Sequence, residues 1–184
     1  MDTGGMVMSE AVVGIIAEYN PLHNGHFHHL ARAREESGAR GVVVVLSSYF
    51  VQRGEPAMVD KWARTAMALA CGADVVLELP TVFSCHNAGV FANAAVDLLA
   101  TLGGVTHVAF GMEEPQGDLE TLGAILMEEP EAFKSALQRF LQEGFSFVES
   151  RSRALETLVP GSASLLRGSN NTLALAYCCR IRSR

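Results

Sequence analysis

Four histidines stand close together in the segment EYNPLHNGHFHHL, residues 18 to 30. His23 and His26 are three residues apart, which would bring them to one face of the first turn of a helix. Imidazole N–H groups can donate hydrogen bonds to phosphate oxygens and stabilise the charge that develops on a phosphorus under attack. The pattern His-Asn-Gly-His therefore predicts that His23 and His26 are catalytic residues acting on a phosphate.

Two other interpretations of the histidines are open. A zinc ion could use several of these rings, but no further type of ligand stands at the usual spacing. The rings could also be merely solvated at a helix end, but Asn20-Pro21 and Gly25 would then need a separate explanation. We expect the histidines to bind no metal, and we expect His28 and His29 to pack or to support the first two rings.

The elements that must position these histidines can be read from hydropathy. Four short apolar runs cover residues 11–17, 42–46, 74–79 and 106–111, and unbroken apolarity is typical of strands that are covered on both faces. Helical patterns lie between them at 25–37, 60–72 and 87–103. Strand and helix in alternation predict an α/β fold, a Rossmann-like doubly wound parallel sheet with right-handed crossovers.

The histidines fall where such a sheet binds ligands, between the first strand and the first helix. The amino end of a helix attracts phosphate through its free N–H groups and its dipole. Gly25 has no side chain that would keep a nucleotide away from the backbone. This position favours nucleotide binding over the two alternatives.

The sequence divides into two parts. We assign residues 10–117 to a Rossmann-like nucleotide-binding core. After it the pattern is almost wholly helical, with breaks at Pro130 and Gly144, so residues 118–184 are assigned to a helical portion.

Composition sets further limits. With 49% hydrophobic and 18% charged residues, the chain is globular rather than disordered. It lacks both an apolar run of about 20 residues, which a membrane span needs, and a signal-type start in MDTGGMVMSE, so we expect a cytoplasmic protein. The net charge of −6 argues against coating nucleic acid by bulk electrostatics, although Arg180, Arg182 and Arg184 make the end locally basic. The four cysteines show no C-x-x-C spacing, and we expect free thiols that bind no metal.

Two long segments, GIIAEYNPLHNGHFHHL and FVQRGEPAMVDKWARTAMALACGADVVLELP, resemble the tRNA(Met) cytidine acetate ligase family of the HxGH nucleotidyltransferase superfamily. The resemblance continues through VFS, FA, VDLL and FGME to GSNNTLALAY, from about residue 12 to residue 177. It implies an ATP-dependent ligase with Mg²⁺ expected. Acetate would attack the α-phosphate to give acetyl-adenylate, and the wobble cytidine of elongator tRNA(Met) would then become N4-acetylcytidine.

The resemblance also implies a set of site residues. Residues 16 to 29 would form the nucleotide loop, a glycine after the fourth strand would let backbone approach the nucleotide, and an asparagine of the SNN motif would cap a helix facing the same site. The residues implied are Ile16, Asn20, His23, Gly25, His26, His29, Gly111, Asn170 and Asn171.

The loop after the second strand offers further candidates with competing interpretations. Arg53 could bind phosphate or carboxylate, or be a solvated loop charge. We expect Asp60 to cap the following helix and Trp62 to pack rather than to stack on a base. Glu78 could hold a magnesium ion or a hydroxyl, or accept hydrogen bonds from loop amides.

The sequence departs from the family pattern in several places. Ser48 and Tyr49 stand where a Gly-Asn pair is usual, and Gly89 and Ala94 stand where a glutamate and a glycine are usual. The family runs on beyond the position where this chain ends in CCRIRSR, so we expect a form truncated at its C-terminus. Two alternatives to the ligase follow: an HxGH adenylyltransferase of cofactor synthesis, or an inactive paralogue that binds nucleotide.

Overall fold

The computed structural model describes residues 10–113 and 118–184, which divide into two compact units. The first unit holds the described residues up to His86 together with Asp97–Phe110, and the second holds Asn87–Val96 and the described residues from Gly111 to Arg184. Residues 1–9, which make up most of the start expected to lack a signal, lie outside the described residues. The expected boundary after residue 117 also falls at an undescribed stretch, residues 114–117.

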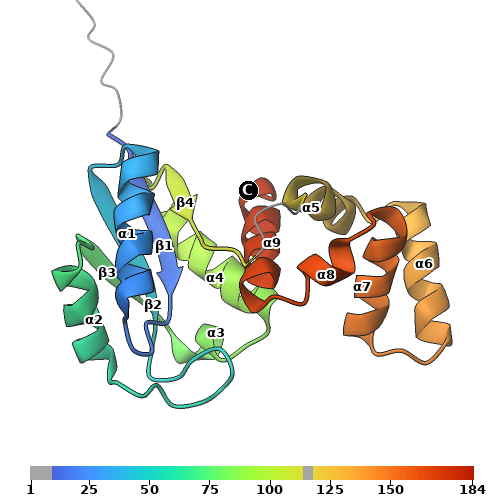
Figure 1. Cartoon of the computed structure of the whole chain (residues 1–184), viewed down its shortest axis with the longest axis horizontal. Coiled ribbons are helices and arrows are strands. Elements are labelled where there is room, and N and C mark those ends of the chain that lie inside the picture. Colours follow the sequence, from blue (N-terminus) through green and yellow to red (C-terminus); the bar gives the residue numbers. More distant parts are fainter. Residues whose placement is uncertain (1–9, 114–117) are drawn as a thin grey trace, which may run out of the picture. The chain divides into compact units, whose positions relative to one another are not determined.

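The first unit is built on a four-stranded parallel sheet, as the sequence predicts (Figure 1). Its strands are β1 (Val12–Ala17), β2 (Gly41–Ser47), β3 (Val75–Leu79) and β4 (His107–Ala109), in the spatial order β3-β2-β1-β4. β1 therefore lies between β2 and β4, and the chain reverses its direction of winding after β3. The α/β fold class is confirmed.

Three crossover helices join the strands, close to the predicted ranges: α1 (Asn24–Ser37), α2 (Lys61–Ala70) and α4 (Ala88–Thr101). A fourth, short helix, α3 (Thr81–Ser84), was not predicted. Gly38 ends α1 with a left-handed backbone at φ 61°, and its N–H donates to the carbonyls of Arg34 and Glu35. Such a conformation favours glycine.

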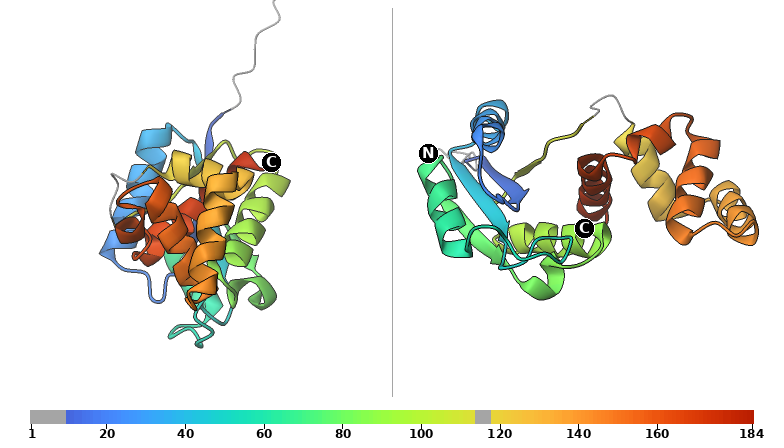
Figure 2. Two further views of the ribbon diagram at one scale, coloured as in Figure 1. Left: turned by 90° about the vertical axis from the view of Figure 1, so that its right-hand side faces the viewer. Right: turned by 60° about the horizontal axis from the view of Figure 1, so that its bottom comes forward.

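The two faces of the sheet are covered by different helices (Figure 2). Val13 and Ile15 of β1 belong to one buried cluster with Leu30 of α1 and Ala68 of α2. Gly14 points the other way, since successive residues of a strand alternate in direction. A Cβ atom on Gly14 would lie only 2.6 Å from Cδ1 of Leu99 in α4, so glycine is required for α4 to pack this close.

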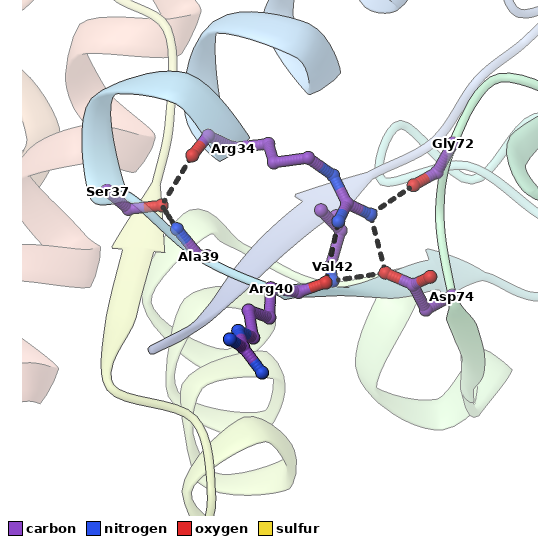
Figure 3. A network of polar contacts seen from close by, with 7 residues as sticks. All are labelled: Arg34, Ser37, Ala39, Arg40, Val42, Gly72 and Asp74. Carbon is purple, nitrogen blue, oxygen red and sulfur yellow. Dashed lines mark hydrogen bonds and ion pairs between the residues drawn. The ribbon is translucent and has the colours of Figure 1, made fainter. Parts of the chain in front are cut away.

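A polar network fastens the amino ends of β2 and β3 to α1 (Figure 3). The Asp74 carboxylate accepts from the Val42 N–H at 2.7 Å and from the Arg34 guanidinium at 2.6 Å. Arg34 also donates to the carbonyls of Arg40 and Gly72. The network lies at the edge of the sheet opposite to the histidines, so its role is structural.

The described residues of the second unit form five further helices, in agreement with the helical pattern. They are α5 (Leu119–Glu128), α6 (Glu131–Gln142), α7 (Phe147–Leu158), α8 (Ser162–Leu165) and α9 (Ser169–Arg182). Helices α6 and α7 lie side by side, and α5 packs on α9. Pro130 stands at the N-cap of α6, and Gly144 at φ 91° ends the same helix, so both predicted breaks are confirmed.

Two of the composition arguments can be compared with the structure. All four cysteines are free thiols, as expected. Within residues 10–113 and 118–184, no helix combines the length and the apolarity that crossing a bilayer requires.

Candidate active site at the first helix

The carboxyl ends of β1 and β4 mark the switch point of this sheet. From β1 the chain crosses to β2 on one side, and it later returns to β4 on the other side of β1. Open parallel sheets bind ligands at such a point, beyond the carboxyl ends of the strands. The segment that follows β1, from Glu18 to His23, leads from this point into α1.

Two histidine rings cap α1. His23 is the N-cap residue, and its Nδ1 accepts a hydrogen bond from the Gly25 N–H at 3.1 Å. His26, three residues on, reaches back so that its Nδ1 accepts from the His23 N–H at 3.3 Å. This is the reciprocal arrangement of a capping box, made here by imidazoles instead of a hydroxyl and a carboxylate.

The capping bonds fix the tautomer of both rings. A nitrogen that accepts a hydrogen bond carries no proton, so the proton of each neutral imidazole is on Nε2. The two rings are stacked, with centroids 3.7 Å apart and planes 19° from parallel. The site therefore holds two N–H donors side by side, and both donors are free of the capping bonds.

His26 is held neutral by its surroundings. Its ring is half-buried and lies 4.9 Å, centroid to centroid, from the ring of Tyr19, whose backbone is left-handed at φ 45°. Burial, followed by the proximity of His23 and His29, lowers the pKa of His26 to about 4. Burial also lowers the pKa of His29, whose Nε2 is buried without a hydrogen-bond partner, as is the hydroxyl of Tyr19.

The structure gives Gly25 a second reason to be glycine. A Cβ atom there would lie 2.9 Å from Cε1 of His23, so any side chain would displace the capping ring. The N–H groups expected to be free at this helix end are partly used: that of Gly25 by the His23 ring, and that of His26 by the His23 carbonyl. Of the groups in this turn, the Nε2–H donors are the ones best suited to meet an anion.

Arg64 organises this edge of the sheet, and the sequence analysis did not identify it. Its side chain is completely buried and donates to backbone carbonyls from three segments: Glu18 after β1, Ser47 and Ser48 at the end of β2, and Val59. Burial lowers its pKa. The available signal was an arginine four residues before Ala68, on the apolar face of the predicted helix.

The loop between β2 and α2 is fastened to the segment that follows β1 by two further side chains. Glu18 accepts from the Gln52 N–H, and Asn20 accepts from the Met58 N–H, each at 2.6 Å. Asn20 therefore holds the neighbouring loop at Met58. Arg53 is exposed within that loop, next to Gly54 at φ 79°.

The remaining candidates in this loop fall into two groups. Asp60 caps α2 as predicted, since its Oδ1 accepts from the N–H groups of Trp62 and Ala63. The prediction that Trp62 packs is wrong: the side chain is 70% exposed, because its place in the first turn of α2 points it away from the sheet. Glu78 accepts from Lys61 and from the Ser48 hydroxyl, not from loop amides.

Three of the predicted residues, Gly111, Asn170 and Asn171, belong to the second unit. Gly111 is exposed, and a Cβ atom on it would meet no atom within 4 Å. The expectation that an asparagine caps α9 is wrong, because the N-cap is Gly168 and the Glu113 carboxylate accepts from the N–H groups of Asn170 and Asn171, each at 3.0 Å.

Glu113 is the residue that the sequence analysis missed here. Burial raises the pKa of its carboxyl, but the N–H donors of Asn170 and Asn171 outweigh burial and the net pKa is lowered. The side chain of Asn171 is buried; it accepts from the Glu113 N–H and donates to the Leu165 carbonyl. The motifs FGME and SNN are therefore joined by hydrogen bonds in both directions.

Among the described residues, no group of three or more His, Cys, Asp or Glu side chains could hold a metal ion. The two Nδ1 atoms of His23 and His26 are engaged by backbone N–H groups, which leaves the rings as donors rather than as ligands.

Comparison with known proteins adds a family and close structural likeness. Residues 10–184 match the family model described as HIGH Nucleotidyl Transferase. The tRNA(Met) cytidine acetate ligase of Clostridium acetobutylicum is 46% identical over 177 residues, covering 91% of this chain and 44% of that protein. Its counterpart in Syntrophomonas wolfei is 47% identical over 172 residues, covering 91% and 41%.

A solved structure is similar over the same length. The crystal structure of Thermotoga maritima TmcAL bound with alpha-thio ATP superposes with a TM-score of 0.88 at 40% identity, covering 94% of this chain and 44% of that one. The chain thus spans less than half the length of the relatives that it matches.

Proposed function

We propose, from the premise that this chain belongs to the HIGH nucleotidyl transferase family, that it binds ATP at the first helix and activates acetate as acetyl-adenylate. The acetyl group would then pass to the wobble cytidine of elongator tRNA(Met). Two findings support this assignment. The similar structure of Thermotoga maritima TmcAL is bound with alpha-thio ATP. The similar proteins of Clostridium acetobutylicum and Syntrophomonas wolfei are named tRNA(Met) cytidine acetate ligase.

The observation that carries the proposal is the pair of stacked imidazoles with Nδ1 engaged by backbone. In the first step a carboxylate oxygen of acetate attacks the α-phosphorus, the bond to the β-phosphate breaks, and pyrophosphate leaves. Negative charge builds up on the phosphate oxygens, where His23 and His26 can donate through Nε2–H. Because both rings are held in place by their capping bonds before the charge develops, they need little reorganisation.

The second step transfers the acetyl group. The exocyclic N4 of cytidine attacks the acetyl carbonyl carbon, the bond from that carbon to the phosphate oxygen breaks, AMP leaves, and N4 loses a proton. Mg²⁺ is proposed as a companion of ATP.

The roles of the other residues follow from their contacts. Gly25 makes room for the His23 ring, while Ile16 and His29 flank the nucleotide loop at its two ends. Asn20 acts by holding the loop around Met58. In the second unit, Gly111 and Asn170 are proposed to contact the nucleotide, and Asn171 to hold Glu113 in place.

The test is exchange of labelled pyrophosphate into ATP in the presence of acetate, first without and then with a transcript of tRNA(Met). His26→Ala should lower the exchange rate by a factor on the order of 10² to 10³. His28→Ala, an exposed histidine two residues along the same helix, is the matched control and should retain the rate. Equal rates for the two variants would remove His26 from the mechanism.

The same assay decides between the alternatives. Exchange that requires a phosphopantetheine or nicotinamide mononucleotide substrate in place of acetate would identify an adenylyltransferase of cofactor synthesis. ATP binding without any exchange would identify an inactive paralogue.

A further inference from the structure

A second cluster of side chains lies on the same edge of the sheet as the histidines. It consists of Ser48, Tyr49, Lys61, Trp62 and Glu78, and we call it the aromatic cluster. Tyr49 and Trp62 are exposed aromatic rings, at 49% and 70%. The Lys61 ammonium lies over both of them, 4.6 Å from the centroid of Tyr49 and 5.1 Å from that of Trp62.

The cluster is fixed in place by hydrogen bonds. Lys61 donates to both carboxylate oxygens of Glu78, at 2.8 and 2.7 Å, and the Ser48 hydroxyl donates to one of them at 2.5 Å. The Lys61 donors lower the pKa of the Glu78 carboxyl first, followed by the Ser48 hydroxyl. The lysine side chain is only 16% exposed, whereas the two rings that it contacts remain largely exposed.

Some hydrogen-bonding capacity is left over. An ammonium has three N–H donors and a carboxylate has about four acceptor positions. Two donors of Lys61 and three positions on Glu78 are used by the bonds given above. Hydrogen bonding to Glu78 first, and to Tyr49 as well, raises the pKa of Lys61, so its third donor is engaged. The capacity left is one acceptor position on Glu78, beside two exposed aromatic rings.

The register of the sheet relates this cluster to the histidines. Ala17 at the end of β1 is aligned with Leu46 of β2, which is aligned with Glu78 of β3. Neighbouring strands are about 4.8 Å apart, so Glu78 is roughly 10 Å from the strand end that leads to His23. A group bound at the cluster would stand within reach of a phosphate bound at the histidines.

We propose that the aromatic cluster binds the unpaired nucleobase that accepts the acyl group, and this inference rests on the proposed function. Exposed aromatic rings bind unpaired bases of single-stranded RNA by stacking. The edge of cytosine presents the N4–H donor, which matches the acceptor position left on Glu78.

The surrounding charges indicate how such a base is held. The charge of Lys61 is matched by Glu78, and the nearby Arg53 is accompanied by Glu55 and Asp60, so the cluster has no net positive charge. Binding therefore depends on stacking rather than on neutralising phosphates. Its affinity should change little with salt, unlike that of proteins that contact many phosphates.

The protein provides its own probe, because Trp62 is its single tryptophan. Intrinsic fluorescence is titrated with a short RNA in which cytidine is the only base and all other positions are abasic, and with the fully abasic RNA. We expect the cytidine-bearing RNA to quench the fluorescence and the abasic RNA to leave it unchanged. Equal responses to both RNAs, or a steep loss of affinity with salt, would overturn the proposal.

Variants test the same point with a labelled form of the cytidine-bearing RNA. Trp62→Leu should weaken binding by on the order of tenfold, and Trp62→Phe should restore most of it, because a base gains affinity by stacking on an aromatic ring. Phe147→Leu, which removes a similarly exposed aromatic residue at the start of α7, is the matched control. Thermal unfolding checks that each variant is folded.

The outcome is separable from that of the proposed function. Pyrophosphate exchange by the unaltered protein tests adenylation without RNA. If the unaltered protein exchanges pyrophosphate but Trp62→Leu binds the RNA as tightly as the unaltered protein, only the proposed role of the aromatic cluster is refuted. If cytidine quenches the Trp62 fluorescence but no pyrophosphate exchange occurs, adenylation is refuted and the proposed base site is retained.

Discussion

Replacing His26 by glutamine should change how stability depends on pH. Glutamine at this position can still accept the His23 N–H, because Gln is one of the residues that close a capping box, but it does not titrate. The unaltered ring has a pKa of about 4 in the folded protein, against about 6.5 in an unfolded chain. Between these values the unfolded chain binds more protons, so stability is complete above pH 6.5 and falls as the pH drops toward 4.

The size of the effect follows from that difference. Lowering the pH from 7.5 to 5 should destabilise the protein through His26 by about 2 kcal/mol at most. Because the ring is only half-buried, solvent screening reduces the expectation to about 1 kcal/mol. His29, whose pKa is also lowered by burial, is present in both proteins and cancels in the comparison.

Urea denaturation at pH 7.5 and pH 5 measures the difference directly. The unaltered protein should lose more stability than His26→Gln over this interval, and His28→Gln should behave like the unaltered protein. If the loss is the same for His26→Gln and for the unaltered protein, the ring is not held neutral by its surroundings, and the argument for preorganised Nε2–H donors is refuted.

Three other perturbations have defined outcomes. Gly14→Ala should cost about 1–3 kcal/mol through overlap with Leu99, and urea denaturation of Gly14→Ala combined with Leu99→Ala should show a loss smaller than that of the two changes added together. Asp74→Ala should cost about 1 kcal/mol, because it removes hydrogen bonds to the Val42 N–H and to Arg34. The Val42 N–H, followed by Arg34, lowers the pKa of Asp74, so the difference in stability from the unaltered protein should fade below about pH 4. Equal losses of stability at pH 7 and pH 3 would contradict this. Glu113→Ala should speed hydrogen exchange at the amides of Asn170 and Asn171, while Glu120→Ala, in the same unit, should leave these amides unchanged.

Much of the first unit follows from local sequence. β2 is buried along almost its whole length and β1 in its middle, and continuous burial leaves a pattern that can be read without a structure. The edge strands β3 and β4 carry the same apolar pattern but are partly exposed, because each has a neighbouring strand on one side only. Asp60 and the glycines that end helices act on neighbouring backbone, so their types and positions were sufficient. The histidine pair was predicted for the same reason, since a spacing of three residues in one turn already brings the two rings together.

The remaining features depend on residues that are distant in the chain. Arg64 gathers carbonyls from positions as far away as Glu18, and Glu113 meets Asn170 and Asn171 across more than fifty residues. Such contacts arise only when the strands and helices have packed, and no local pattern records them. Trp62 illustrates the opposite error, because an aromatic residue in a helix is usually buried, and only the direction of α2 against the sheet decided that this one faces solvent. The sequence by itself determined the order of the main strands and helices along the chain, the caps and the paired imidazoles, because these depend on neighbours in the chain. The tertiary structure decided which charged side chains join the loops and which aromatic rings stay exposed, because these depend on distant segments that meet after folding.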